Sequence, residues 1–168
     1  FDAVAGEVER GTLPLLLTYP GARVEILIGK LMAHVGVLVL AVVAGYGLAG
    51  AAAFWADPAS AAGLLALIRL TWTSVLLGAT FLGAGYALSS LARRPSGAAG
   101  LAMGLWLGAV VLYDLGLLAA VVADDGGWFT TDLFPIALLA NPAYAFRLFN
   151  LAASEASAAA AGVAGVAN

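Results

Sequence analysis

Two ionisable side chains, Arg69 and Asp114, stand inside long apolar stretches, where a charge needs a partner or water. Counted from the ends that we place outside the membrane below, Arg69 lies about six residues past Gly63 and Asp114 about nine before Ala123, or roughly 9 and 14 Å at helical rise. Similar depths on antiparallel neighbouring helices permit an ion pair. The pair either locks two helices together or lines a translocation path. We favour the structural role, since a long arginine side chain can also reach the membrane interface.

The remaining residue types do not form a recognisable catalytic or metal site. The chain has no cysteine, its only histidine is His34, which we interpret as a packing residue, and Met32 and Met103 are too separated for a thioether metal site. Asp114 has no second carboxylate in its stretch, and no phosphate-binding loop is present. The seven basic residues form no concentrated patch that would bind nucleic acid. We therefore expect no catalytic residue, no metal, no cofactor and no nucleic-acid partner.

Three apolar runs hold these residues and predict the fold class. Of the 168 residues, 63% are hydrophobic and 10% charged, which is too apolar for a soluble core. The predicted spans are residues 31–54, 63–91 and 97–123, each long enough to cross about 30 Å of hydrocarbon. We predict an all-α, polytopic helical membrane protein that makes direct contact with lipid.

The lysines and arginines orient these spans. Three precede the first span, none separates the first from the second, two separate the second from the third, and one follows. The positive-inside bias therefore places residues 1–30 and 92–96 in the cytoplasm and residues 55–62 and 124–156 outside. Residues 157–168 begin a further span. We expect residues 1–168 to be a fragment of a single transmembrane domain.

The outer segment that follows the third span is rich in aromatic residues and contains two prolines, Pro135 and Pro142. Its apolar part, Leu133 to Ala140, is too short to cross the membrane. We predict helices that lie in the outer interface or dip into it, where aromatic rings anchor well.

Small residues recur at helical spacing in the third span, at Gly100, Gly104 and Gly108. Two overlapping G-x-x-x-G units of this kind allow helices to approach closely. We interpret the glycines as ordinary helix packing, with a dimer face of two subunits as the alternative.

The cytoplasmic stretch from Glu7 to Lys30 combines several features in order: an acidic pair, a Gly-Thr turn, a short leucine-rich helix, a proline break, a basic residue and a Gly-Lys entry to a span. This order resembles the coupling-helix segment of ABC-2 type transporter permeases. The resemblance implies that docking on a cytoplasmic ABC ATPase subunit involves Glu7, Glu9, Arg10, Thr12, Leu13, Leu16 and Tyr19. Pro20 and Gly21 would be the hinge that passes a rigid-body motion to the next helix.

Two further segments, Phe1–Glu7 and Asn141–Asn150, look like permeases of the ABC transporters that mature nitrous oxide reductase. The resemblance implies a non-catalytic transport subunit in a bacterial inner membrane, paired as a permease homodimer. Its cargo would be a sulfur-containing species for the copper–sulfur centre of that denitrification enzyme. Residues 128–150 would form the outer gate and a docking surface for a periplasmic partner. Their gate residues would include Trp128, Asn141, Pro142, Phe146 and Arg147.

The main alternative is a channel or multi-span scaffold that works without an ATPase. A channel has no need of the arrangement from Glu9 to Lys30, whereas an ABC permease without it would be uncoupled. An intramembrane enzyme is a third possibility, and it would need polar residues from spans outside this chain.

Overall fold

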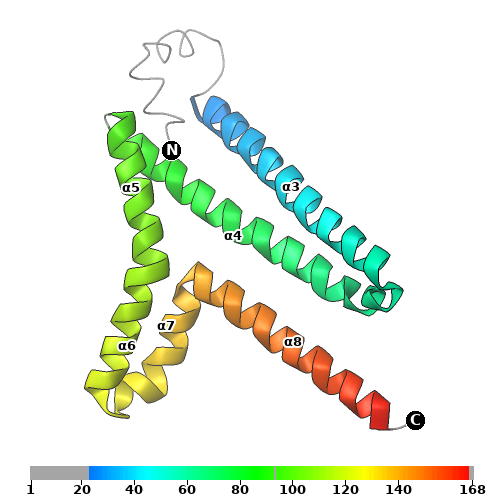
Figure 1. The fold of residues 1–168 in the computed structure, drawn as a ribbon. Coiled ribbons are helices and arrows are strands. Elements are labelled where there is room, and N and C mark those ends of the chain that lie inside the picture. The colour runs from blue at the N-terminus through cyan, green and yellow to red at the C-terminus, as the bar shows by residue number, and fades with distance from the viewer. Residues whose placement is uncertain (1–22, 93, 167–168) are drawn as a thin grey trace. The chain divides into compact units, whose positions relative to one another are not determined.

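The structure, a computed structural model, describes residues 23–92 and 94–166, except for the side chains of residues 23, 61–62 and 155–166. Every regular element in these ranges is a helix (Figure 1), which confirms the predicted all-α fold class. The chain divides into two compact units. The first comprises Phe1–Ala41 and Gly78–Leu118, and the second comprises Val42–Leu77 and Ala119–Asn168.

Three helical stretches are long and apolar enough to cross a membrane. The first is α3 (Arg23–Ala56) and the second is α4 (Leu64–Leu91). The third consists of α5 (Pro95–Leu107), the π-helical η2 (Gly108–Leu112) and α6 (Tyr113–Asp124). Helices satisfy their own backbone hydrogen bonds, which hydrocarbon requires of any spanning segment. These stretches overlap the three predicted spans, and the side of the membrane that each end faces stays a prediction.

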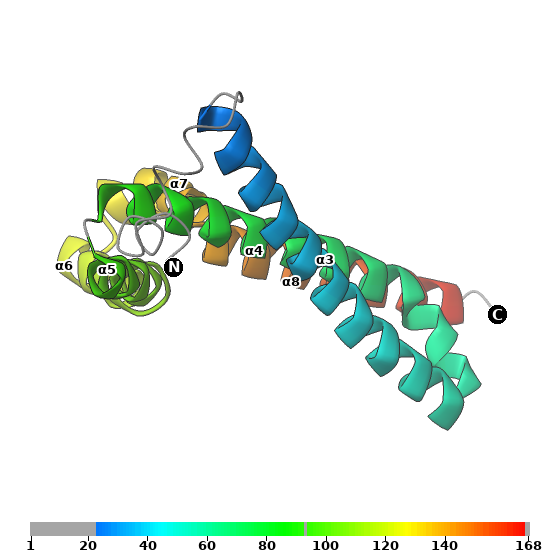
Figure 2. The same cartoon turned by 90° about the horizontal axis from the view of Figure 1, so that it is seen from above.

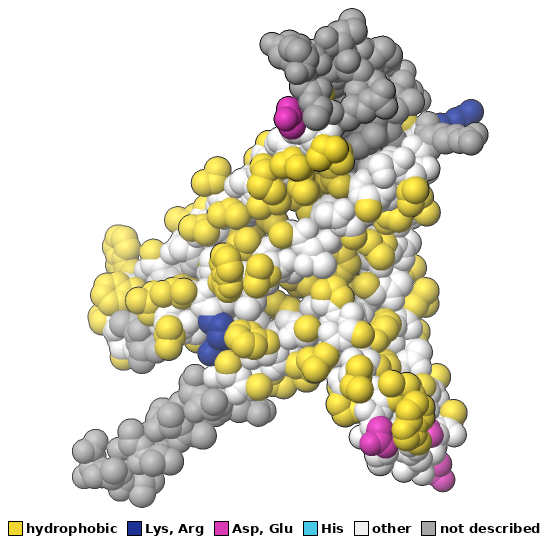
Figure 3. All heavy atoms as spheres, turned by 180° about the vertical axis from the view of Figure 1, so that it is seen from behind, with side chains coloured by type: hydrophobic (Ala, Val, Ile, Leu, Met, Phe, Trp, Pro, Cys, Tyr) yellow, Lys and Arg dark blue, Asp and Glu magenta, His cyan; other side chains and the backbone are white. Residues whose placement is uncertain are grey.

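The surfaces of these helices are apolar. Side chains such as Leu40, Leu48 and Trp55 are 71%, 74% and 89% exposed. Figure 3 shows hydrophobic side chains over most of the visible face, with charged side chains at a few places only. So much exposed apolar area is unfavourable in water and favourable in lipid. The described chain is therefore built as a multi-pass membrane protein.

Short connections join the helices. The 3-10 helix η1 (Pro58–Gly63) links the end of α3 to the start of α4 (Figure 2). After α6, Asp125 and Gly126 adopt φ values of 46° and 83°, a left-handed conformation that glycine adopts without steric cost. The chain continues through the π-helical η3 (Phe129–Leu133), α7 (Phe134–Ala140) and α8 (Pro142–Val166).

Contacts between α3 and α4 follow an antiparallel register within each unit. In the first unit, a Cβ atom on Gly78 would lie 2.8 Å from the Leu38 Cδ2 atom, closer than real Cβ atoms approach a neighbour. In the second unit, a Cβ atom on Gly50 would lie 2.5 Å from the Leu67 Cδ2 atom. A glycine at each of these two positions therefore lets the facing leucine pack against the helix backbone, as is typical of membrane helices.

We expect Gly78→Ala to destabilise the protein by about 1 kcal/mol, because the added methyl group displaces Leu38 and the overpacking outweighs the gain in helix propensity. In the Leu38→Ala background, where the facing side chain is shortened, Gly78→Ala should cost less stability than it does in the wild type. Thermal unfolding of the purified protein in detergent measures the effect.

The matched control is Gly83→Ala in the same helix, since a Cβ atom there would have no described neighbour within 4 Å. Equal losses for Gly78→Ala and Gly83→Ala would contradict the close approach of Leu38 to α4.

Candidate functional site

Polar side chains join α4 to α8 in the second unit. The Arg69 Nη1 atom donates a hydrogen bond to the Ala153 carbonyl oxygen over 3.4 Å. The Asn150 Nδ2 atom donates to the Thr73 hydroxyl oxygen over 3.0 Å and to the Phe146 carbonyl oxygen over 2.9 Å. The Thr73 hydroxyl in turn donates to the Arg69 carbonyl oxygen over 2.9 Å. We name the side chains of Arg69, Thr73 and Asn150 the polar seam.

The polar seam fixes the direction of α8. Residue 69 meets residue 153 and residue 73 meets residue 150, so α8 runs antiparallel to the first half of α4. Figures 1 and 2 both show α8 following the line of this part of α4. In an alternating topology, a span that follows α6 must run parallel to α4. Because α8 runs the other way, we interpret α7 and α8 as a loop that enters the membrane and returns to the same side.

The elbow of this loop lies at Asn141. Helices η3 and α7 on one side and α8 on the other are bent by 101° at this residue. Asn141 is only 4% exposed, and its Oδ1 atom accepts a hydrogen bond from the backbone N–H of Ala143 over 2.9 Å. Pro142 follows as the first residue of α8, where its missing N–H costs nothing. The two residues therefore end α7 and cap α8.

The other predicted gate residues lie apart from the elbow. Trp128 precedes η3 and is 68% exposed. Phe146 contributes its carbonyl oxygen to Asn150, and the Arg147 Cζ atom lies 5.5 Å from the centroid of the Tyr144 ring. Asn141 and Pro142 thus form the elbow, Phe146 and Arg147 lie near the start of α8, and Trp128 lies at the far end of the other arm.

The sequence interpretation missed the role of Thr73 and Asn150. Thr73 bonds a carbonyl of its own helix, as hydroxyl side chains in helices commonly do, but its bond to a residue 77 positions away has no local signal. An asparagine in an otherwise apolar helix is the one hint available from the sequence.

The α3–α4 pair carries polar contacts of its own. In the first unit, the His34 Nδ1 atom lies 2.8 Å from the Tyr86 hydroxyl oxygen and 2.9 Å from the Lys30 carbonyl oxygen. The two rings meet edge to face with centroids 5.7 Å apart. In the second unit, the hydroxyl groups of Tyr46 and Ser74 lie 3.2 Å apart. These contacts support the interpretation of His34 as a packing residue, with Tyr86 as its neighbour.

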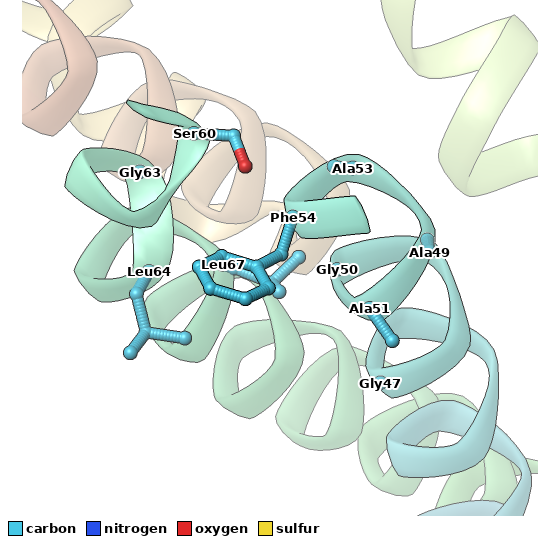
Figure 4. Close-up of a pocket in the computed structure, with 10 residues that line it drawn as sticks. All are labelled: Gly47, Ala49, Gly50, Ala51, Ala53, Phe54, Ser60, Gly63, Leu64 and Leu67. Carbon is cyan, nitrogen blue, oxygen red and sulfur yellow. The ribbon is translucent and has the colours of Figure 1, made fainter. Parts of the chain in front are cut away.

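A cavity of about 630 Å³ lies between the end of α3 and the start of α4 (Figure 4). Its lining is almost entirely apolar and includes Phe54, Leu64 and Leu67, with Ser60 as the polar side chain. No ionisable group stands among the described residues that line it. The cavity can therefore take an apolar chain, and it offers no partner to a charged substrate.

Comparison with known proteins identifies the family. The family model described as ABC-2 family transporter protein matches residues 1–166. The chain belongs to the ABC-2 transporter family. It is 45% identical over 158 residues to the "Probable ABC transporter permease protein NosY" of Pseudomonas aeruginosa, covering 93% of this chain and 57% of the relative. A relative of the same name from Stutzerimonas stutzeri is 44% identical over 157 residues, covering 92% and 56%. The chain thus spans little more than half the length of these relatives.

The predicted ATPase-docking residues of this ABC-2 chain lie outside the described residues. They are Glu7, Glu9, Arg10, Thr12, Leu13, Leu16 and Tyr19, and the hinge residues Pro20 and Gly21 lie there too. Their roles stay predictions.

Two other predictions also stay open. Asp114 is exposed in the first turn of α6 and belongs to the first unit, whereas Arg69 belongs to the second, so their pairing stays a prediction. Cβ atoms at Gly100, Gly104 and Gly108 would have no described atom within 4 Å, so the packing role of these glycines also stays a prediction. Among the described residues, no three His, Asp or Glu side chains gather where a metal ion could bind.

We expect a double-mutant cycle of Thr73→Ala and Asn150→Ala in the full-length protein to show a coupling energy of about 1 kcal/mol, because the two side chains bond each other inside the membrane. Unfolding in mixed detergent micelles measures the four free energies. Additive losses would contradict the polar seam.

Site-directed labelling of the full-length protein tests the returning loop. This chain contributes no cysteine to the background, and any cysteine outside it is first replaced by serine. Variants Trp128→Cys and Ala160→Cys flank the elbow on the two arms of the loop, and both should react with an impermeant maleimide from the outer side in whole cells. Ala92→Cys, beyond the end of α4, should react only after permeabilisation. Labelling of Ala160→Cys only from the cytoplasmic side would show that α7 and α8 form one broken span.

Proposed function

We propose that this chain is the central part of the permease subunit of an ABC transporter, in which a separate ATPase subunit hydrolyses ATP. Membership of the ABC-2 family over residues 1–166 is the observation that carries the proposal. The coupling-helix resemblance between Glu7 and Lys30 supports it, because a permease needs a cytoplasmic segment that receives motion from the ATPase. The subunit itself would be non-catalytic, and its membrane would be the inner membrane of a bacterium.

The cargo we propose is a sulfur-containing species that is exported for the copper–sulfur centre of nitrous oxide reductase. Two relatives that carry the NosY permease name, at 45% and 44% identity, support this narrower assignment. The segments Phe1–Glu7 and Asn141–Asn150, which resemble this group of permeases, support it as well. The role of such a subunit would be to open and close a path under the control of the ATPase.

The geometry of the second unit fits an outer gate. The returning loop is held to α4 by a few polar contacts, namely Arg69 to Ala153 and Thr73 to Asn150. The bond between Thr73 and Asn150 joins neutral groups, and such bonds in membranes are modest, about 0.6 to 2 kcal/mol each. The bond from Arg69 is long, at 3.4 Å. A loop fastened in this way can move without unfolding either helix, and its exposed aromatic Trp128 could contact a periplasmic partner protein.

A second copy of the permease would complete the transporter. Cβ atoms at Gly100 and Gly104 of α5 would have no described neighbour within 4 Å, so a helix from another span or from that second copy can pack against these glycines. We propose a homodimer, in keeping with the two ATPases that such transporters use.

We expect the full-length protein, co-expressed with ABC ATPases encoded beside its gene, to retain one of them through purification in detergent. Glu9→Arg should abolish this retention, because it reverses a charge in the proposed docking helix. The matched control is Asp57→Arg, which makes the same charge change in the connection between α3 and α4 that we place outside the membrane.

Retention of the ATPase by Glu9→Arg at the wild-type level would contradict the docking assignment. Failure of the wild type to retain any ATPase would favour a channel or scaffold that works without one.

A further inference from the structure

Arg69 carries a positive charge into the second unit, and among the described residues its guanidinium has few partners. Its side chain is part-buried, and a guanidinium has five N–H donors. One of these, on Nη1, reaches the Ala153 carbonyl oxygen over a long 3.4 Å. The Nε atom is buried and has no hydrogen-bond partner in the part of the chain that the structure describes. A charged group that is partly buried and makes few hydrogen bonds is unfavourable, unless a group of opposite charge lies close to it.

The direction of the side chain argues against simple contact with lipid headgroups. An arginine that faces lipid extends along its own helix toward the interface. Arg69 instead reaches across to the backbone of α8, on the same face of α4 as Thr73, one turn further along. The guanidinium therefore lies between α4 and α8.

The rest of the polar seam does not neutralise this charge. The Asn150 amide nitrogen is engaged by the Thr73 hydroxyl and the Phe146 carbonyl, and the Thr73 hydroxyl donates to the Arg69 carbonyl. All of these groups are neutral. They keep α8 against α4, and among the side chains that the structure describes they supply no negative charge to the guanidinium at the end of the seam nearer the start of α4.

We propose that this end of the polar seam binds a small inorganic anion, with the Arg69 guanidinium as the charged ligand. The role of the site rests on the proposed function. A sulfur species exported as hydrosulfide carries a negative charge that would neutralise the Arg69 guanidinium. A guanidinium suits such a ligand, because it offers a permanent charge and several donors at once. A bound anion would also remain close to α8, the helix that the proposed gate moves.

The test measures binding of radiolabelled hydrosulfide to the full-length protein in a maltoside detergent, which contains no phosphate, at mildly alkaline pH where hydrosulfide is ionised. We expect saturable binding that is about tenfold or more weaker in Arg69→Gln, because a charge-assisted hydrogen bond is lost. Arg69→Lys keeps the charge and should bind with intermediate affinity, which separates loss of the site from loss of the fold. The matched control is Arg94→Gln, an exposed arginine before α5, which should bind as the wild type does.

Several outcomes would overturn the site. Wild-type protein without saturable binding, or Arg69→Gln with unchanged affinity, would do so directly. Binding that appears only after Asp114→Asn or Glu155→Gln would show that an internal carboxylate neutralises Arg69. An Arg69-dependent effect seen only when anionic lipid is added would assign the residue to lipid phosphate.

The result is independent of the ATPase. Hydrosulfide binding at Arg69 in a protein that retains no ATPase would support the anion site and contradict the proposed transporter. Retention of the ATPase without anion binding would support the transporter and overturn the site.

Discussion

Hydrocarbon offers no hydrogen-bond partners, and this constraint explains where the described chain forms helices, where these helices end and where their polar side chains lie. The long apolar stretches are helical because a helix satisfies its own backbone. Where a helix must end inside apolar surroundings, a side chain replaces the missing partners, as Asn141 does for the N–H of Ala143. Where a side chain is polar, it finds another helix, as Asn150 finds Thr73. Polar groups therefore mark the places where the chain turns or where helices meet.

The same constraint separates what the sequence could predict from what it could not. Spans can be recognised from composition and length alone. The predicted spans 31–54, 63–91 and 97–123 accordingly overlap the long helical stretches Val24–Ala56, Leu64–Leu91 and Pro95–Asp124. The proline at residue 142 and the short apolar run before it were enough to predict an interrupted segment, and α7 does end just before this proline. The depth at which the segment lies stays a prediction. The direction of α8 was not predictable, because it depends on pairs such as 73 with 150, which are distant in the chain. Local periodicity carries no information about such a pair.

The residues of the candidate site divide in the same way. The position of Arg69 in an apolar run singles it out from sequence alone, and a partner in the third span was the natural expectation. The structure gives its Nη1 atom a backbone carbonyl of α8 as partner, at Ala153, which no side-chain pattern could suggest. The docking residues from Glu7 to Tyr19 came from a resemblance between sequences, and family membership over residues 1–166 supports the resemblance as a whole. Family membership does not test the individual residues.

Helix α4 uses different faces for its two neighbours in the second unit. Leu67 and Ser74, seven residues apart, meet α3 through Gly50 and Tyr46. Residue 69 lies about 200° around the helix from residue 67, so Arg69 and Thr73 meet α8 on another side. Close packing against glycine joins α3 to α4, whereas a few polar bonds join α8. A motion that parts α8 from α4 would therefore leave the α3–α4 contacts intact, and the charge of Arg69 would be uncovered in the process.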